Sequence, residues 1–253
     1  MNRPILGVLG GLGPAASVYF YDLITSHTAA NKDSDHIDLV LASAASTPDR
    51  TDFIVGDGED PLPSMIETAK RLAAFGADFI ALPCNTAHYF YEKLTAATER
   101  PVINIIRETV DYLRSQGITR MGLLATDGTV TSGAYEKVCF DAGIECITPD
   151  ESARKKIMSI IYDDIKAGKS PDMEAFHGVS ASLLSHGAQK IVLGCTELSL
   201  IKRDEHLPDS VYVDSLEVLA CRCITLCGKK PIGFCRSLIT FEGERDALFG
   251  AVN

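Results

Sequence analysis

The chain has 253 residues, of which 46% are hydrophobic, and a formal net charge of -10 at pH 7. This size allows a substantial core, either in one large domain or in two lobes of about 100 to 130 residues each. The negative charge argues against nucleic acid or an anionic membrane as a partner, because phosphates would be repelled overall. An anionic substrate must therefore be bound by local cations.

The N-terminal apolar stretch is interrupted by glycines and by Pro14, which indicates a strand and a turn rather than a secretory signal. No run approaches the roughly 18 continuous apolar residues of a membrane-spanning helix. We therefore expect a cytoplasmic protein with reduced thiols. Four of the eight cysteines form a loose C-terminal group without the CxxC spacing of a zinc hairpin, so we favour packing roles and expect no metal: Cys221, Cys223, Cys227 and Cys235.

Short β-rich runs alternate with helical patterns in the first half of the chain. Strands are predicted at residues 5–9, 37–42, 79–82 and 102–105, with helices after Pro14, over residues 63–75 and after Asn85. The pattern repeats with strands at 121–125, 144–148 and 191–193, and helices at 135–142, 152–167 and 174–186. This alternation predicts an α/β fold with parallel strands joined by helical crossovers, in two pseudo-equivalent lobes.

The lobe boundaries follow from this repeat. We expect the first lobe to comprise residues 1–100 and 208–228, with a final helix from about 215 to 226 that packs back on it. The second lobe should comprise residues 101–207. Residues 229–253 are expected to form a C-terminal extension of unknown role.

Two cysteines occupy corresponding places in the lobes. Residues 76–78, Gly-Ala-Asp, lead into a strand that ends at Cys84, and residues 187–189, Gly-Ala-Gln, lead into one that ends at Cys195. Each cysteine follows the carboxyl end of a strand and precedes a helix, where open α/β sheets bind ligands and where helix N–H groups favour thiolate. A single such cysteine would be interpreted as a small buried hydrophobe, but the shared context favours chemistry.

The placement of Cys84 and Cys195 predicts proton transfer. On opposite sides of a cleft, they would present one proton acceptor to each face of a bound carbon acid, which is what racemisation requires. One thiolate removes the α-proton while the opposite thiol delivers a proton to the other face. The resting protonation states of the two thiols must therefore differ.

Several other residues are candidates for binding an anion. Asn85 and Thr86 offer donors beside Cys84, and residues 126–129, Thr-Asp-Gly-Thr, predict a nest of donors after a second-lobe strand. Arg50 follows the second strand and is suited to a bidentate carboxylate contact, although a solvated turn arginine is the alternative. Lys166 is a further candidate cation, and the alternative is that it stabilises a helix C-terminus. For His88 we favour a structural role.

The glycine-rich turn at residues 10–16 fits a relaxed dinucleotide fingerprint. Pro14 removes a backbone N–H that a pyrophosphate would use, and no acidic residue ends the second strand to hold a ribose. We therefore favour the floor of a small-anion pocket, formed at Gly11 and Leu12, or a turn with no ligand at all.

With these motifs in view, the chain resembles the aspartate/glutamate racemase family, in particular its cofactor-independent aspartate racemases. The resemblance covers about residues 4 to 225. It is carried by the motifs at residues 10–14 (GGLGP), 48–51 (PDRT), 58–61 (GEDP), 83–88 (PCNTAH), 123–126 (LLAT) with 128–129 (GT), 166–168 (KAG) and 194–197 (GCTE).

The resemblance implies two Rossmann-like lobes around an active-site cleft, a homodimer, no cofactor, and Cys84 and Cys195 as catalytic acid and base. It further implies that Arg50 and Lys166 recognise a side-chain carboxylate, with Lys156 as a substitute for Lys166. The groups that would hold the α-carboxylate and its neighbourhood are Asn85, Thr86, Thr126 and Thr196.

The resemblance also distinguishes branches of the family. In glutamate racemases the second cysteine is followed by Thr-His, and an early Asp-Ser assists the first. Here Glu197 takes the place of the histidine and Gly10-Gly11 that of the acid. This favours the aspartate branch and makes Glu197 a candidate auxiliary group for Cys195.

Interconversion of L- and D-aspartate by two cysteines is therefore the predicted function. The alternatives are a broader acidic amino-acid racemase, a maleate isomerase-like enzyme, an amino-acid binding regulatory protein and, opposed by Pro14, an NAD-binding oxidoreductase.

Overall fold

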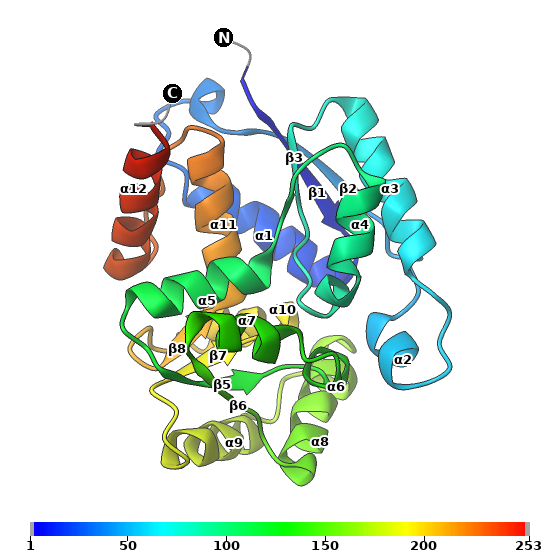
Figure 1. Cartoon of the computed structure of the whole chain (residues 1–253), viewed down its shortest axis with the longest axis vertical. Coiled ribbons are helices and arrows are strands. Elements are labelled where there is room, and N and C mark those ends of the chain that lie inside the picture. The colour runs from blue at the N-terminus through cyan, green and yellow to red at the C-terminus, as the bar shows by residue number, and fades with distance from the viewer. Residues whose placement is uncertain (1–2, 251–253) are drawn as a thin grey trace.

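The computed structural model describes residues 3–250, with side chains as far as residue 245. It contains two four-stranded parallel sheets, one in the upper and one in the lower half of the view in Figure 1. The first has the order β2-β1-β3-β4 and the second the order β6-β5-β7-β8, so the two sheets repeat one topology. The prediction of an α/β fold with two pseudo-equivalent lobes is confirmed. The strands are β1 (Ile5–Gly10), β2 (Asp38–Ser43), β3 (Phe79–Ala81), β4 (Val102–Ile103), β5 (Arg120–Leu124), β6 (Glu145–Ile147), β7 (Lys190–Leu193) and β8 (Tyr212–Asp214).

Helices connect the strands of each sheet, as parallel pairing requires. The first lobe uses α1 (Pro14–Ser26), α2 (Arg50–Val55), α3 (Leu62–Phe75) and α4 (Tyr91–Ala97), with two 3₁₀ turns, η1 (Asp33–Asp35) and η2 (Thr86–Phe90). The second uses α6 (Asp127–Thr131), α7 (Ala134–Ala142), α8 (Glu151–Ser159), the π-helical segment η3 (Ile160–Ile165), α9 (Met173–Ser185) and α10 (Thr196–Asp204). In the part of the chain that the structure describes, no helix is both long and apolar enough to cross a membrane.

Many of these helices begin where the sequence supplies a capping side chain. A side-chain oxygen at the N-cap accepts backbone N–H groups of the first turn, which would otherwise lack partners. These N-caps are Asp49 for α2, Asn104 for α5 (Ile105–Ser115), Thr126 for α6, Asp150 for α8, Asp172 for α9 and Asp214 for α11 (Ser215–Leu226).

Two short strands correct the expected lobe boundaries. Val102–Ile103, assigned to the second lobe, pairs with β3 in the first sheet. Tyr212–Asp214, assigned to the first lobe, pairs with β7 in the second. Each lobe therefore completes its own fourth strand before the chain crosses over, through α5 (Ile105–Ser115) in one direction and α11 (Ser215–Leu226) in the other.

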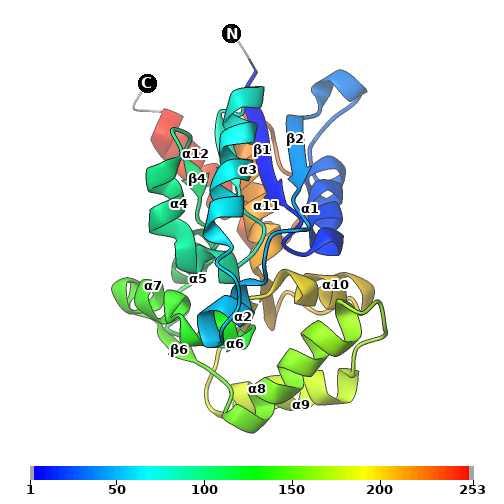
Figure 2. The same ribbon diagram turned by 90° about the vertical axis from the view of Figure 1, so that its right-hand side faces the viewer.

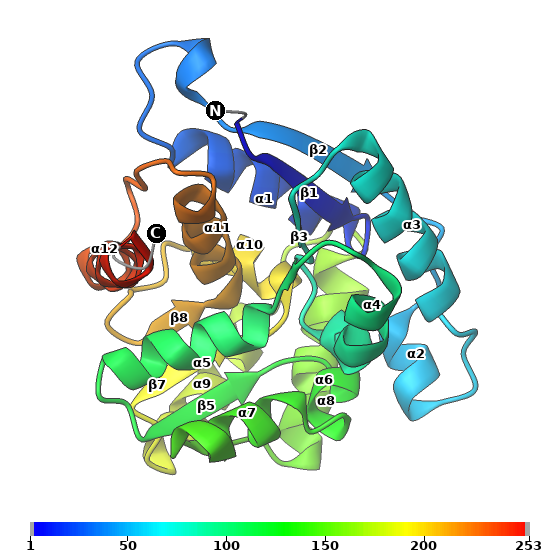
Figure 3. The same cartoon turned by 45° about the horizontal axis from the view of Figure 1, so that its top comes forward.

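Helices α5 and α11 fix the lobes relative to each other. They pack against one another, and α11 also packs on α1, as expected (Figures 2 and 3). Val110 and Leu113 of α5 and Leu216 and Leu219 of α11 belong to one apolar cluster that continues into both sheets. Because each fully buried side chain of this kind contributes about 1.5–3 kcal/mol, this shared core holds the two sheets in a defined arrangement.

The C-terminal extension completes this core. After Gly228 the chain forms α12 (Arg236–Gly250), which packs on α11 and α5 (Figure 3). Phe234, Leu238 and Phe241 are buried in the shared cluster. Arg245 of α12 also forms ion pairs with Glu108 of α5 and with Glu242 of its own helix. The extension thus covers apolar surface of the crossover helices.

Candidate active site

A small closed cavity lies between the lobes, at the carboxyl ends of both sheets. Cys84 follows β3 and Cys195 follows β7, the corresponding third strands of the two sheets. The cavity has a volume of about 10 Å³ for a water-sized sphere, room for about one water molecule. All the predicted site residues except Gly11 line it, and the described residues around it are Leu12, Asp49, Arg50, Thr51, Cys84, Asn85, Thr86, Thr126, Tyr162, Lys166, Cys195, Thr196 and Glu197.

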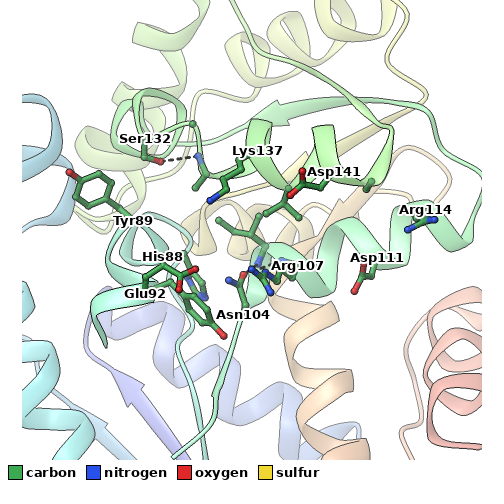
Figure 4. Close-up of a pocket in the computed structure, with 16 residues that line it drawn as sticks. His88, Tyr89, Glu92, Asn104, Arg107, Asp111, Arg114, Ser132, Lys137 and Asp141 are labelled. Atoms are coloured by element: carbon green, nitrogen blue, oxygen red, sulfur yellow. Dashed lines mark hydrogen bonds between the residues drawn. The ribbon is translucent and has the colours of Figure 1, made fainter. Parts of the chain in front are cut away.

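A larger groove of about 610 Å³ is lined by His88 and by residues of η2, α4, α5 and α7 (Figure 4). Arg107 of α5 and Lys137 of α7 reach into it from facing helices. Neither Cys84 nor Cys195 lines this groove, although His88, four residues after Cys84, does. Size therefore does not identify the site here; the convergence of both strand-end cysteines does.

Arg50 places a positive charge beside Cys84. Its Nη2 donates to the carbonyl of Leu12 at 2.7 Å and its Nη1 to that of Pro48 at 3.0 Å. Burial opposes the charge, but Cys84 and Asp49 outweigh burial and raise the pKa of Arg50 above its ordinary value. The backbone holds this fork in place, while its buried Nε has no hydrogen-bond partner among the described residues.

Glu197 places a negative charge beside Cys195. The thiol Sγ donates to Oε2 of Glu197 at 2.9 Å, and both side chains are buried. Burial, and then the charge and hydrogen bond of Glu197, raise the pKa of Cys195 well above its ordinary value, although Lys166 opposes this. The N-terminus of α10 favours a thiolate at Cys195, but burial and the carboxylate of Glu197 outweigh it.

The glycine-rich turn makes room for this carboxylate. A Cβ atom at Gly13 would stand only 2.3 Å from Oε1 of Glu197. Gly11 does not line the cavity, which corrects its predicted binding role. Its N–H donates to Oγ of Ser17 at 2.8 Å, and its φ of 86° requires glycine.

An unpredicted cluster bridges the lobes at the cavity. The Tyr162 hydroxyl donates to both carboxylate oxygens of Asp49, at 3.1 and 3.2 Å, and Lys166 Nζ lies 3.4 Å from Asp49 Oδ2. Lys166 Nζ also lies 3.7 Å from the centre of the Tyr162 ring. Burial opposes the charge on Lys166, but Glu197, Tyr162, Cys195 and Asp49 together raise its pKa. Lys156, the substitute proposed for Lys166, is exposed on α8 and does not line the cavity.

Sequence reasoning missed Asp49 and Tyr162 as site residues. Asp49 was only part of a motif, and in the structure it also caps α2 by accepting the N–H groups of Thr51 and Asp52. Tyr162 precedes Lys166 by four residues in a predicted helix, a spacing that places side chains on one face and was the available signal. The helix is locally π-helical here, a feature that often accompanies functional sites.

Three threonines join the lobes beside the cavity. Oγ1 of Thr86 lies 3.0 Å from Oγ1 of Thr126 and 2.9 Å from Oγ1 of Thr129. A Cβ atom at Gly128 would stand 2.9 Å from Cα of Thr51, so α6 approaches α2 closely (Figure 2). The predicted donor nest at residues 126–129 thus packs against the other lobe, with Thr126 also facing the cavity.

His88 connects the Cys84 turn to α5. Cys84 and Asn85 lead into η2, a 3₁₀ turn that precedes α4, rather than directly into an α-helix. Nε2 of His88 accepts the N–H of Ile105 at 3.2 Å, so Nδ1 carries the proton and donates to the carbonyl of Cys84 at 2.9 Å. Burial lowers the pKa of His88 to about 4, which keeps the ring neutral. His88 does not line the cavity, in keeping with a structural role.

Three of the remaining cysteines have packing roles. Cys221, Cys223 and Cys227 are buried in α11 and its end, within the shared core. Among the described side chains, no group of three or more histidines, cysteines or carboxylates is gathered as a metal centre requires.

Comparison with known proteins agrees with this fold. The model of a family described as Asp/Glu/Hydantoin racemase matches residues 9–222. The broad-specificity amino-acid racemase RacX of Bacillus subtilis (strain 168) is 28% identical over 221 residues, covering 85% of this chain and 95% of that protein. The solved aspartate racemase of Picrophilus torridus is 30% identical, with a TM-score of 0.80 over 90% of this chain and 96% of that one. The glutamate racemase of Francisella tularensis, solved with D-glutamate, shares the fold at 21% identity and a TM-score of 0.57, covering 89% of this chain and 81% of that one.

Proposed function

The chain belongs to the Asp/Glu/hydantoin racemase family, and on this premise we propose that it interconverts L- and D-aspartate with Cys84 and Cys195 as the two acid–base groups. The observation that carries the proposal is the opposite environment of two equivalent cysteines. Cys84 has the cation Arg50 beside it, whereas Cys195 hydrogen-bonds to the carboxylate of Glu197.

The two environments suit the two roles. Cys84, as thiolate, takes the α-proton: a C–H bond breaks, an S–H bond forms, and negative charge passes to the α-carbon and its carboxylate. Cys195, as thiol, then gives its proton to the opposite face, and the charge passes to its sulfur. The mirror substrate runs these steps in reverse.

Charge at the cavity suits a dicarboxylic amino acid. Arg50 and Lys166 supply one cation each, and Asn85, Thr86, Thr126 and Thr196 supply donors for a carboxylate. Similarity to the Picrophilus torridus enzyme supports aspartate. Similarity to RacX supports a second candidate, a racemase of broader range. We propose that no cofactor takes part, since Glu197 fills the turn where a dinucleotide phosphate would bind.

The described state is closed. A cavity for about one water cannot hold aspartate, so α2 must part from η3 to admit it, breaking the contacts of Asp49 with Tyr162 and Lys166. Reclosure excludes water and strengthens the electrostatic interactions that stabilise the transition state. We also propose, from the family resemblance, that two copies form a homodimer, which light scattering would test.

Incubation with each enantiomer of aspartate, glutamate and alanine in D2O tests the function. Inversion and α-deuterium incorporation are expected with aspartate, without added pyridoxal phosphate or metal. Cys84→Ser and Cys195→Ser should each lower inversion by at least about 10³-fold, within the range that acid–base groups contribute. Cys146→Ser, outside the cavity, is the matched control.

Three results would contradict parts of the proposal. Full inversion in either cysteine variant would exclude the two-thiol mechanism. Loss of inversion on removal of pyridoxal phosphate would exclude the cofactor-free reaction. Similar kcat/KM values for alanine and aspartate would replace aspartate specificity by the broader range.

A further inference from the structure

A chain of hydrogen bonds fixes the orientation of the Asn85 amide. Oγ of Ser215 donates to the carbonyl of Leu193 at 2.8 Å. A hydroxyl has a single hydrogen, so Ser215 Oγ must accept from Nδ2 of Asn85, which lies 3.0 Å away. The amide oxygen Oδ1 then faces the other way and accepts the hydroxyl of Tyr135 at 2.8 Å. The backbone carbonyl of Leu193 therefore determines which way the amide points.

These hydrogen bonds join the segments that carry the two cysteines. Asn85 directly follows Cys84, and Leu193 stands two residues before Cys195. Ser215 begins α11 after β8, and Tyr135 lies on α7 in the second lobe. Tyr135 and Ser215 are fully buried, so bulk solvent does not compete with either hydrogen bond.

Tyr135 is suited to act as a permanent donor. Burial raises the pKa of its hydroxyl above the ordinary value, so it stays protonated at any working pH. With Oδ1 taken by Tyr135 and one Nδ2 hydrogen by Ser215, the second Nδ2 hydrogen remains for the cavity that Asn85 lines.

We infer that Tyr135 and Ser215 are positioning residues that hold Asn85 and set the alignment of the two thiols with the α-carbon. The inference rests on the proposed racemase function and adds to it two residues that do not line the cavity. Its physical basis is the steep dependence of proton transfer on geometry, where a displacement of about 1 Å can cost about 10²-fold in rate.

The test uses Tyr135→Phe and Ser215→Ala, with Tyr112→Phe as matched control. Tyr112 is also buried, and its hydroxyl bonds to Ser237 at 2.6 Å, outside the cavity. Each purified full-length variant is incubated in D2O with L- and with D-aspartate. Two rates are measured: inversion, and deuterium incorporation into the enantiomer that is recovered uninverted.

The ratio of these rates separates alignment from stability. Loss of folded enzyme lowers both rates equally. Misaligned thiols instead allow the first proton transfer to occur and reverse, with exchange, while delivery to the opposite face fails. We expect inversion to fall at least about 10-fold in Tyr135→Phe and Ser215→Ala and the exchange-to-inversion ratio to rise at least about 3-fold, with Tyr112→Phe at the wild-type ratio.

A wild-type ratio in both variants would overturn the inference. If Tyr135→Phe does not fold, Ser215→Ala decides alone, because it leaves the Asp214 cap of α11 in place. A further check adds Tyr135→Phe to Asn85→Ala: the ratio should not change again if Tyr135 acts through Asn85, and an additional rise would contradict that route. Absence of exchange and inversion in the wild-type protein would instead count against the proposed function.

Discussion

The thiol of Cys195 donates to Oε2 of Glu197 at 2.9 Å, in a pair that is closed off from solvent. A carboxylate beside a buried sulfur disfavours a second negative charge, so it keeps the proton on Cys195. Cys84 instead has the guanidinium of Arg50 beside it. The two strand-end cysteines therefore differ in charge environment although their places in the fold are equivalent.

Replacement of Glu197 by Gln should shift the alkaline limb of the activity profile to lower pH. The amide keeps a hydrogen-bond acceptor near Cys195 but removes the charge that raises the pKa of the thiol. An acid that loses its proton at lower pH stops working earlier, so above the lowered pKa kcat/KM should fall by about 10-fold per pH unit. The pH dependence of kcat/KM for aspartate measures the position of this limb.

The exposed Glu205, at the end of the same helix, is the control for this change. Glu205→Gln should keep the wild-type profile. An unchanged alkaline limb in Glu197→Gln would remove Glu197 from its auxiliary role.

Replacement of Arg50 by Lys should weaken aspartate turnover even though the charge is kept. A lysine cannot reproduce the fork that contacts the carbonyls of Leu12 and Pro48. Losing a hydrogen bond to a charged group costs about 1.5–3 kcal/mol, so kcat/KM should fall about 10- to 100-fold. Steady-state kinetics with both enantiomers measure this.

Arg71→Lys is the matched control, since Arg71 forms an exposed ion pair with Glu67 on α3. It should leave kcat/KM unchanged. Wild-type kinetics in Arg50→Lys would mean that a simple positive charge suffices at this position.

His88 should make stability depend on pH. Its pKa is about 4 in the folded chain against 6.5 for the ordinary side chain, so between these values the unfolded chain binds the extra proton. Stability is then full above about pH 6.5 and is lost as pH falls towards 4, by about 3 kcal/mol at about 1.4 kcal/mol per pKa unit. In urea unfolding at pH 7, 5.5 and 4.5, His88→Gln should lose less stability on acidification than the wild type, by about 2.5 kcal/mol at pH 4.5, where most of this loss has occurred.

His177→Gln, at an exposed position on α9, controls for the loss of a histidine and should follow the wild-type pH dependence. Parallel curves for His88→Gln and the wild type would show that burial of the His88 ring does not govern acid stability.

Phe241→Ala should destabilise the protein without altering its chemistry. Phe241 is buried in the shared core, with its ring centre 5.6 Å from that of Tyr112. Truncation of a buried phenylalanine costs about 3–5 kcal/mol, and none of the described side chains of α12 lines the cavity. Thermal unfolding and kcat/KM at a temperature where the variant stays folded separate the two effects.

The nearby exposed residue Ile232 provides the control, because Ile232→Ala should change stability by less than about 0.5 kcal/mol. A large loss of kcat/KM in folded Phe241→Ala would show that α12 influences the cavity.

Pattern alone predicted most of the fold because long amphipathic helices and apolar strands carry strong periodic signals. Strands β4 and β8 were assigned to the wrong lobes because strands of two and three residues carry almost no pattern, and pairing partners are decided by backbone contacts between distant segments. The short helices α2 and α6 were not predicted for the same reason.

The sequence by itself determined that two cysteines end equivalent strands, and that Arg50 and several hydroxyl and amide donors reach the same sheet edges, whereas a binding role for Lys166 entered only through the family resemblance. The carboxyl ends of parallel strands converge, so strand order suffices for that conclusion. Only the tertiary structure decided that a cation stands beside Cys84 and a carboxylate beside Cys195, that Asp49 and Tyr162 bridge the lobes, and that Tyr135 and Ser215 hold Asn85. Burial and distances of a few ångströms between segments remote in sequence govern these relationships, and no local pattern encodes either quantity.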